Sequence, residues 1–323
     1  MNLGGFCPNS REGESISLRI KIAIGLTIVS LIWGSTWLAI KFGISTVPPF
    51  LAAGLRFLIA TLILRAIMLI RKDPLPREKI FWVLVAQLGL LTYTLPFAFI
   101  YWGQSRIPTG LSSILFATFP FWVALFSHLR LENERINYAK AVGVIAGFVG
   151  VFVIFSSEVL FEQEASLDGM VAIVASALMQ GYGLVSLKKW GKGFNSVAIN
   201  FAGMMIGSII LLGASLVTED YTRLEFNSAS LIPLLYLSTL GTVLTYVMYY
   251  WLAKHVNAVL LSMTAFVTPI IAVVLGAMVL REHMSNQVFV GGALVLGGIV
   301  YANAPELMKY VEKRRAAVPE EST

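Results

Sequence analysis

The chain carries a long succession of apolar stretches, each close to the roughly 20 residues that a helix needs to cross a bilayer. Only 13% of its 323 residues are charged, against roughly 25% in soluble domains, and the mean hydropathy is +0.78. One soluble core of this size could not bury so much apolar surface. We therefore predict an all-α integral membrane protein with ten transmembrane helices, at 20–40, 50–70, 80–103, 108–128, 136–156, 168–188, 196–217, 230–253, 258–280 and 286–304.

A segment in the first half of the chain returns in the second half. Residues 101–134 recur as 250–282, offset by 149 positions and then, after one deleted residue, by 148. The matched pairs, in order, are Tyr101 with Tyr250, Trp102 with Trp251, Pro120 with Pro269, Glu134 with Glu282, Gly143 with Gly291 and Gly150 with Gly298. Such an ordered series indicates an internal duplication. The paired glycines would let the helix after each Glu pack closely against a neighbouring helix.

The duplication divides the chain into two halves of five predicted spans each. We assign 1–19 to an N-terminal tail, 20–156 to the first repeat, 157–167 to a connector, 168–304 to the second repeat and 305–323 to a C-terminal tail. The first apolar run is long and lacks a small-residue cleavage site, so we expect a retained span and not a signal peptide. Because five is odd, the second repeat would enter the membrane in the opposite sense, which is the inverted-repeat construction of many secondary transporters.

The charges of the loops orient this arrangement. With the N-terminus in the cytoplasm, nineteen of the 24 Lys and Arg residues fall in inside segments and four in outside segments, while Arg56 lies within a span. The acidic segments around 158–168 and 219–225 then fall outside, together with the connector. This bias predicts cytoplasmic N- and C-termini for a protein of the cell (inner) membrane. It also accounts for the net charge of +6 without a nucleic-acid partner.

Several kinds of chemistry are not indicated by the sequence. Cys7 is the only cysteine, and His128, His255 and His283 lie far apart, so no metal-ligand spacing is present. The chain has no GxxxxGK[ST] phosphate-binding motif. No predicted span has an Asp or Glu near its middle, which argues against a carboxylate proton relay. We therefore expect no cofactor and no metal, while Na⁺ bound by backbone carbonyls stays open.

The motif WGSTW at 33–37, followed by Lys41, resembles the first helix of the EamA family in the drug/metabolite transporter superfamily. Arg56 with Phe57, and the repeated Pro, Glu and Gly series, resemble the same family, and the resemblance covers about residues 20–304. The resemblance implies a 5+5 inverted repeat that exports or exchanges metabolites or amino acids. Aromatic amino acid exporters of this family are similar in architecture.

The two halves differ at positions that the duplication pairs. At an offset of 147, Trp33 aligns with Gln180, Trp37 with Leu184 and Arg56 with Gly203. We therefore expect an asymmetric cavity between the halves, with an aromatic wall that comes mainly from the first half.

Polar and aromatic side chains within spans are the candidates for a solute-binding site, because positions that face lipid should be apolar. The candidate cavity-lining residues are Trp33, Thr36 and Trp37 in the first span, Gln87, Thr94 and Tyr101 in the third, Gln180 and Tyr182 in the sixth, and Thr242, Tyr246 and Tyr249 in the eighth. In the first, third and eighth spans these residues share one helix face. The alternatives are an aromatic packing stripe, hydrogen bonds between helices, and buried structural tyrosines. Tyrosine rings would suit a flat or aromatic solute.

Five further residues have candidate structural roles. Pro120 and Pro269 would bend the fourth and ninth spans, either as hinges or as static kinks. Glu134 and Glu282 would lie at the membrane boundary before the following helix, where a carboxylate suits the helix dipole. Arg56 could snorkel, cap a neighbouring helix or bind a solute carboxylate.

Together these features predict a secondary transporter, not an enzyme, that moves a small organic solute across the lipid bilayer by alternating access. Two other classes stay open. An intramembrane lipid-modifying enzyme would use His128 with Glu132 and Glu134 as its nearest candidate cluster, and a channel would give single-channel currents. The sequence leaves the solute, the coupling ion and the oligomeric state open.

Overall fold

The computed structural model describes residues 10–131, 138–157, 166–222, 224–256, 261, 264–282 and 285–315, and over these ranges the chain is helical and contains no strand. The elements are α1 (Ser10–Gly43), α2 (Pro49–Arg71), α3 (Lys79–Leu88), η1 (Gly89–Thr94), α4 (Leu95–Gln104), α5 (Thr109–Phe116), α6 (Phe119–Arg130), α7 (Tyr138–Ser157), α8 (Leu167–Trp190), α9 (Ser196–Thr218), α10 (Ser228–Ser238), η3 (Thr239–Leu244), α11 (Thr245–His255), α13 (Thr264–Leu275), η4 (Gly276–Leu280) and α14 (Asn286–Arg315). The predicted all-α class is confirmed for these residues. Glu132, Glu134 and most of the predicted connector lie outside them.

Seven helical segments of the described chain are long and apolar enough to cross a membrane: Ile20–Gly43, Pro49–Arg71, Lys79–Gln104, Thr109–Arg130, Leu167–Trp190, Ser196–Thr218 and Ser228–His255. Three shorter apolar helices, Ala141–Ile154, Val267–Leu280 and Asn286–Tyr301, occupy the places of the predicted fifth, ninth and tenth spans. Most helix ends lie close to the predicted span ends.

Two spans that the duplication pairs are each interrupted by a π-helical turn. α3 continues through η1 into α4, and α10 continues through η3 into α11. A π-helical turn inserts an extra residue and rotates the side chains that follow about the helix axis. The register of both spans therefore changes near the middle of the bundle.

The fourth predicted span is broken in a different way. α5 ends at Phe116 and α6 begins at Phe119, so Pro120 lies in the first turn of α6. A proline at a helix start loses no helical hydrogen bond. The span is therefore interrupted at Ala117 and Thr118, directly before Pro120, and not by a proline inside a continuous helix. Its counterpart Pro269 lies inside α13, as predicted.

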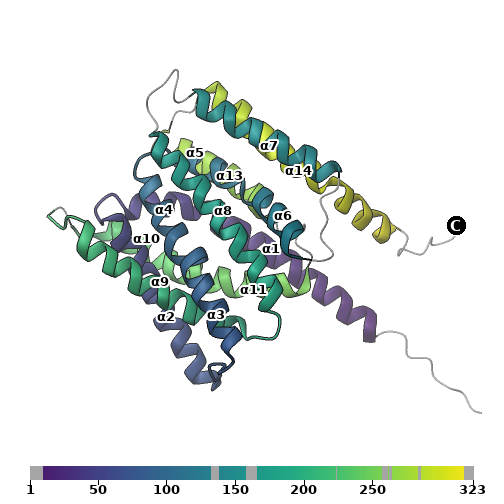
Figure 1. Ribbon diagram of the computed structural model, residues 1–323, viewed down its shortest axis with the longest axis horizontal. Helices are drawn as coiled ribbons and strands as arrows, with labels where there is room; N and C mark the ends of the chain where they lie inside the picture. The colour runs from purple at the N-terminus through teal and green to yellow at the C-terminus, as the bar shows by residue number, and fades with distance from the viewer. Residues whose placement is uncertain are drawn as a thin grey trace, which may run out of the picture.

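Helices of the two halves pack against each other in exchanged pairs (Figure 1). α2 packs along α9, and α7 packs along α14. α1 packs against α13 and against α10 and α11, while its counterpart α8 packs against α6 and against α4. Thus α1 of the first half packs on helices of the second half, and its counterpart α8 packs on the corresponding helices of the first half.

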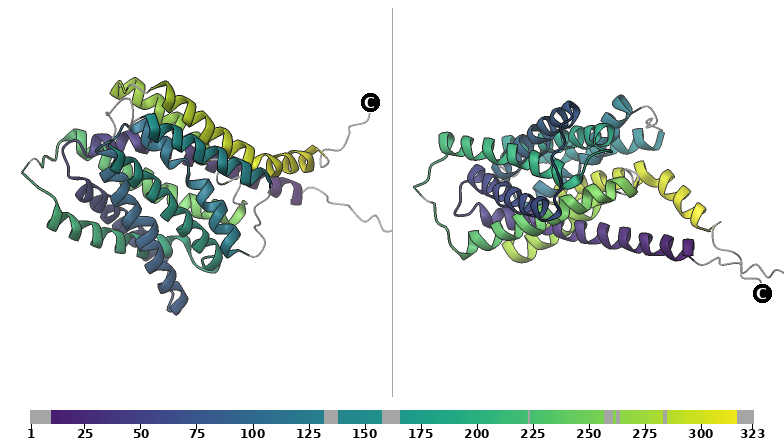
Figure 2. Two further views of the ribbon diagram at one scale, coloured as in Figure 1. Left: turned by 45° about the horizontal axis from the view of Figure 1, so that its top comes forward. Right: turned by 90° about the horizontal axis from the view of Figure 1, so that it is seen from below.

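The α7–α14 pair forms one edge of the molecule (Figure 2) and depends on the paired glycines. A Cβ atom added at Gly150 would lie 2.5 Å from the carbonyl oxygen of Gly291, and one added at Gly298 would lie 2.5 Å from that of Gly143. Small residues permit such a close helix approach. The predicted close packing by these glycines is confirmed.

Basic and acidic residues gather at opposite ends of the bundle. At the basic end, Asn195 Nδ2 donates to Asp73 Oδ2 at 3.0 Å and Lys254 Nζ donates to the Phe194 carbonyl at 3.2 Å, which joins the loops after α2 and α8 to the end of α11. The start of α1 and the end of α14 point toward this end (Figure 2). The loops that carry Glu219 and Glu282 lie at the other end.

These two carboxylates cap helices of the first half. Glu219 accepts backbone N–H groups at 2.6 and 2.9 Å from the start of α2, and Glu282 accepts those of Thr109 and Gly110 at 2.8 and 3.1 Å at the start of α5. The sequence predicted that Glu282 would serve the helix that follows it, α14. Its backbone N–H instead bonds back to Gly276 in η4 at 3.2 Å, and its side chain reaches across to α5.

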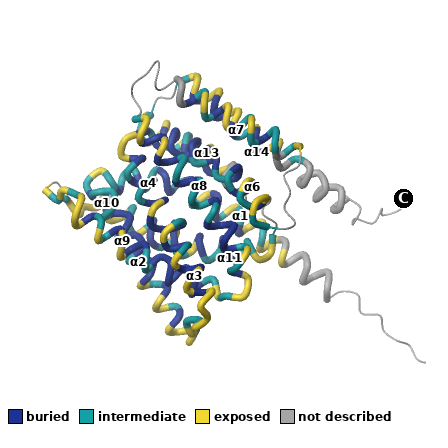
Figure 3. The backbone as a smooth tube through the Cα atoms, in the orientation of Figure 1, coloured by how far each residue is buried: buried dark blue, intermediate teal, exposed yellow. Residues whose placement is uncertain are grey.

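Burial follows the inward faces of the helices (Figure 3). Buried residues line the sides on which α2 meets α9 and α8 meets α4 and α6, and exposed residues occupy the outer faces and the ends. Large apolar side chains such as Ile70, Phe152 and Val217 are exposed on the outside. An exposed apolar surface on every side is expected of helices that face lipid.

Candidate solute-binding site

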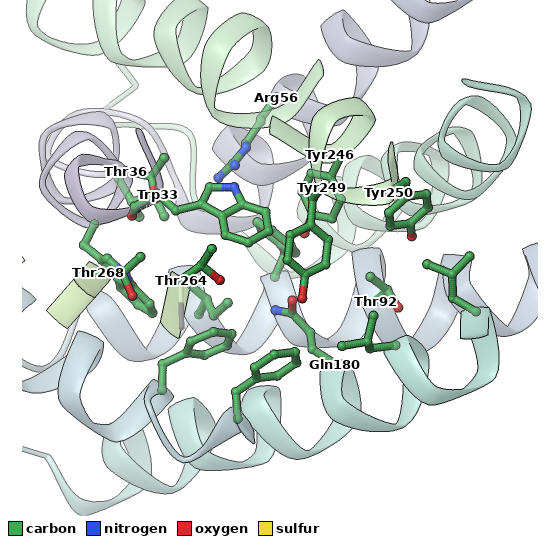
Figure 4. Close-up of a pocket in the computed structure, with 18 residues that line it drawn as sticks. Trp33, Thr36, Arg56, Thr92, Gln180, Tyr246, Tyr249, Tyr250, Thr264 and Thr268 are labelled. Carbon is green, nitrogen blue, oxygen red and sulfur yellow. Dashed lines mark hydrogen bonds between the residues drawn. The ribbon is translucent and has the colours of Figure 1, made fainter. Parts of the chain in front are cut away.

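A cavity lies in the middle of the bundle, between helices of both halves (Figure 4). Its volume is about 110 Å³, and one water needs roughly 10–15 Å³ by this measure, so the cavity has room for a small solute. Its walls come from α1, α2, η1, α4, α5, α6, α8, α11 and α13. The lining residues are Trp33, Thr36, Trp37, Ile40, Arg56, Thr92, Phe97, Ile100, Phe116, Phe119, Gln180, Leu184, Leu187, Tyr246, Tyr249, Tyr250, Thr264 and Thr268.

Arg56 brings a positive charge to the cavity wall. Its side chain is 2% exposed, and Nε donates to Thr242 Oγ1 at 2.7 Å while Nη2 donates to the Gly241 carbonyl at 3.0 Å. Nη1 lies 3.4 Å from the Tyr101 hydroxyl, and the guanidinium carbon lies 4.9 Å from the centre of the Phe97 ring. In the described part of the chain no carboxylate forms an ion pair with Arg56. The buried position excludes snorkelling and leaves the charge without an anionic partner from these residues.

Aromatic rings form the wall beside Arg56. The Trp33 ring centre lies 4.8 Å from that of Tyr249 and 5.6 Å from that of Tyr246. Trp33 Nε1 donates to Thr245 Oγ1 at 3.0 Å, which fixes the indole across the α1–α11 contact. Such a wall presents flat apolar faces to the cavity.

Gln180 lies across the cavity from Arg56. In Figure 4 the rings of Trp33 and Tyr249 lie between the two side chains, and the Gln180 amide points toward the hydroxyl end of Tyr249. The amide makes no hydrogen bond with the described residues, and Thr92 Oγ1 is buried there without a partner. The half-buried Gln180 amide is therefore available to the polar atoms of a bound molecule, whereas Thr92 Oγ1 is covered and packs against Gly183.

A hydrogen-bonded group of three residues supports the wall behind the cavity. Tyr93 donates to Asn200 Oδ1 at 2.6 Å, and its hydroxyl lies 3.0 Å from that of Tyr250. A Cβ atom at Gly203 would lie 2.7 Å from the Tyr93 ring, so this glycine makes room for it. Tyr250 is therefore a fixed part of the wall.

The cavity brings together part of the set that the sequence predicted. Trp33, Thr36, Trp37, Gln180, Tyr246 and Tyr249 line it, and Arg56 joins them. Contact of these residues with a solute stays a prediction.

The three candidates of the third span do not line the cavity. Gln87 Nε2 donates to Ser186 Oγ at 2.9 Å between α3 and α8, and Thr94 Oγ1 donates to the Gly89 carbonyl at 2.7 Å. Tyr101 lies behind the wall, against the arginine. Their seven-residue spacing predicted one face of a regular helix, but η1 falls between the first and the second of them and rotates the register.

Two other candidates also lie outside the cavity. Thr242 is buried in η3 as a hydrogen-bond partner of Arg56. Tyr182 packs edge-on against Phe126 with Arg130 4.5 Å above its ring. Neither residue is among those that line the cavity.

Several of the residues that line the cavity were not predicted from the sequence, although helix periodicity or the repeat offset pointed to some of them. Ile40 lies seven residues after Trp33 on the same face, and the 147-residue offset carries Ile40 onto Leu187 and Trp37 onto Leu184. Thr264 and Thr268 lie one turn apart on α13. Nothing in the sequence distinguished Phe116 or Phe119 from packing residues.

The lining of the cavity is mainly aromatic, aliphatic and hydroxyl-bearing. No group of three His, Cys, Asp or Glu in the described part of the chain could hold a metal ion, and no His, Asp or Glu lines the cavity. His128 is exposed near the end of α6, and the two glutamates predicted to join it lie outside the described ranges. The site offers a cation, aromatic faces, an amide and hydroxyls.

Comparison with known proteins agrees with a membrane transporter. The model of the EamA-like transporter family matches residues 20–156 and again 167–304. The "Uncharacterized transporter YoaV" of Bacillus subtilis (strain 168) is 30% identical over 289 residues, which cover 87% of this chain and 96% of that protein. The "Uncharacterized inner membrane transporter YedA" of Escherichia coli (strain K12) is 28% identical over 280 residues, which cover 84% of this chain and 86% of that protein.

A solved crystal structure shares the fold. It matches with a TM-score of 0.64 at 20% sequence identity, over 87% of this chain and 97% of that chain. The family model covers most of the chain in two copies, and the Bacillus relative matches over nearly its whole length. The chain is therefore a multi-pass membrane protein that belongs to the EamA-like transporter family.

Proposed function

We propose that this protein is a secondary transporter for a small organic solute that combines a carboxylate with a planar or aromatic part, such as an amino acid or a related metabolite. One observation carries the proposal. Arg56 lies buried on the cavity wall, without a carboxylate partner among the described residues, beside the rings of Trp33 and Tyr249.

The cavity wall suggests how such a solute is held. A guanidinium binds a carboxylate by charge-assisted hydrogen bonds, which are about twice as strong as neutral ones. The planar part of the solute packs against the ring of Trp33, and its remaining polar atoms meet the amide of Gln180. A carboxylate from the solute would supply the anion that the described chain does not bring to Arg56.

The proposed architecture is ten spans in a 5+5 inverted repeat, with the shorter helices counted as the fifth, ninth and tenth spans. The exchanged helix contacts, the paired π-helical turns and the double match to the family model support it. Alternating access would then be a rocking of one half against the other around the cavity.

The proposed orientation places the basic end of the bundle and both termini in the cytoplasm, following the positive-inside rule. The name of the Escherichia coli relative, an inner membrane transporter, supports the same membrane for this protein. Export is preferred over import through the family resemblance. Tags at the N-terminus and in the 157–167 connector test the arrangement, since an inverted repeat requires them on opposite sides of the membrane.

A lipid-modifying enzyme and a channel have weaker support. The cavity contains no His, Asp or Glu for catalysis, and its walls come from nine helical elements of both halves, as a solute-binding site between two repeats would require.

The function is tested by counterflow in proteoliposomes of the purified full chain. Phenylalanine and phenethylamine form a matched pair, because the second lacks only the carboxylate. We expect exchange of carboxylated solutes, amino acids among them, and little exchange of phenethylamine. Equal exchange of both compounds would refute the role of Arg56, and no exchange across a broad panel of amino acids and related acids would refute the transporter assignment.

A further inference from the structure

A second cavity lies at the basic end of the bundle, between α8, α9 and α11. Its volume is about 360 Å³, larger than that of the central cavity. It is lined by Leu187, Lys188, Gly191, Lys192, Ser196, Ile199, Tyr250, Ala253 and Lys254.

This cavity shares two wall residues with the central one. Leu187 and Tyr250 line both cavities, and they are only 8% and 5% exposed. The two cavities therefore meet at these side chains. Tyr250 is held by the hydroxyl of Tyr93, 3.0 Å away.

Leu187 has space because of a glycine. A Cβ atom at Gly191 would lie 2.5 Å from the Leu187 carbonyl oxygen and 2.7 Å from Leu187 Cδ1, so any larger residue there would press on the leucine. A leucine side chain can change rotamer, whereas the hydrogen-bonded tyrosine is fixed. Leu187 is thus the movable member of the partition.

The second cavity carries a concentrated positive charge. Three lysines line it, none of its lining residues is acidic, and one of the three, Lys188, already has an interaction partner. Lys254 Nζ donates to the Phe194 carbonyl at 3.2 Å, a contact that does not neutralise its charge. Asp73 at this end is engaged by Asn195 at 3.0 Å and by Arg71 at 3.9 Å. A cleft lined by one sign of charge raises the local concentration of the opposite ion by about 10-fold or more.

We propose that this lysine-lined cavity is an anion-binding vestibule, which draws carboxylate- or phosphate-bearing solutes toward the central cavity past Leu187 and Tyr250. The proposal rests on the proposed transport function and deepens it. It assigns Lys188, Lys192 and Lys254 to solute capture, at a site separate from Arg56.

A cysteine placed between the two cavities reports the charge of the lysine-lined cavity through its rate of reaction with charged thiol reagents. In a Cys7→Ser background, which has no other cysteine, Leu187→Cys places a thiol where the two cavities meet. The purified full chain is treated with 2-sulfonatoethyl and 2-trimethylammonioethyl methanethiosulfonate, one anionic and one cationic. The ratio of the two reaction rates is normalised to that of a free small-molecule thiol.

We expect the anionic reagent to be favoured, and the ratio to fall about 10-fold when Lys188, Lys192 and Lys254 are all changed to Gln. The matched control changes Lys21, Lys79 and Lys189 to Gln. These lysines are exposed and lie outside the cavity, and the net charge changes by the same amount. The control ratio should stay at the parent value.

Three results would overturn the vestibule: an unchanged ratio in the cavity variant, an equal fall in both triple variants, or a thiol that reacts with neither reagent. The same labelling is repeated in nanodiscs of phosphatidylcholine with and without phosphatidylglycerol. Protection from both reagents by phosphatidylglycerol would assign the cavity to a lipid headgroup and also overturn the proposal. No step of this experiment involves solute flux, so its outcome is independent of the transport assay.

Discussion

α1 and α8 occupy corresponding places in the two halves, yet they give the cavity different chemistry. Both helices present the same face, because the lining positions of one map onto those of the other at an offset of 147. The pairs are Trp33 with Gln180, Trp37 with Leu184 and Ile40 with Leu187. The two halves share this helix face. Two of its three side chains are aromatic in the first half and amide or aliphatic in the second, and the third is aliphatic in both.

α2 and α9 show the same division more sharply. α2 contributes the charge of Arg56, and the position that matches it on α9 is Gly203. Gly203 leaves space for the ring of Tyr93, since a Cβ atom there would lie 2.7 Å away. At this pair of positions the first half supplies a charged side chain, and the second half supplies space for a neighbouring ring. The duplicated scaffold thus positions the wall, and the divergence of single residues makes it asymmetric.

The largest expected effect is at Arg56, the residue without an equivalent in the second half. Arg56→Gln should lower proteoliposome flux of a carboxylated solute about 100-fold, because a buried charge pair of this kind contributes roughly 2–5 kcal/mol. Arg56→Lys should recover part of this flux. Since Arg56 also holds η3, thermal unfolding of each variant checks that the protein is intact.

Arg65→Gln is the matched control on the same helix, because Arg65 is exposed and does not line the cavity. It should transport like the parent. Normal flux in Arg56→Gln would place the binding of the carboxylate elsewhere.

The glycines of α1 and α8 should respond alike, since they correspond in the two halves. A Cβ atom at Gly34 would lie 2.6 Å from Ile271, and one at Gly181 would lie 2.8 Å from Trp122. Gly34→Ala and Gly181→Ala should each destabilise the protein by about 2 kcal/mol through overpacking, measured by unfolding in detergent micelles. Gly213→Ala, which has no atom within 4 Å of the added Cβ, should be neutral or stabilising. Equal stability of all three variants would show that the α1–α13 and α8–α6 contacts are loose.

Trp33 and Gln180 should differ in what they recognise. Trp33→Leu should raise the KM for aromatic solutes about 10-fold and leave aliphatic ones nearly unchanged, because ring contacts contribute roughly 0.5–1.5 kcal/mol. Gln180→Leu should raise the KM for both classes by about 10-fold through a lost hydrogen bond. Trp82→Leu, at an exposed position on α3, is the control. If both cavity variants changed selectivity in the same way, the two walls would not be functionally distinct.

The smallest effects belong to the two capping carboxylates. Glu219→Gln and Glu282→Gln should each lower the stability by about 1 kcal/mol, because a neutral amide binds the helix N–H groups less strongly. Flux should be nearly unchanged. Glu225→Gln, an exposed residue near the same end, should have no effect on unfolding, and a loss of flux in Glu282→Gln without a loss of stability would indicate a role beyond capping.

Much of this organisation could be predicted from the sequence because it depends on short-range patterns. The apolar runs placed most helices, and the face shared by Trp33, Thr36 and Trp37 was correct because α1 is a continuous helix. The same argument failed in the third span, where η1 begins two residues after Gln87 and ends at Thr94. Assigning a helix face from residue spacing requires a constant rotation per residue. A π-helical turn changes that rotation, and no clear sequence pattern marks where it does so.

By itself the sequence determined the apolar helices, the two related halves and the separation of charge between the loops, since each depends on composition or on self-similarity along the chain. Only the tertiary structure decided which helices meet, that Glu282 caps α5, and that Arg56 lies beside aromatic rings without a carboxylate among the described residues. The physical reason is that these contacts join positions far apart in the chain. Whether a buried charge is paired depends on every helix packed around it, and no local pattern contains that information.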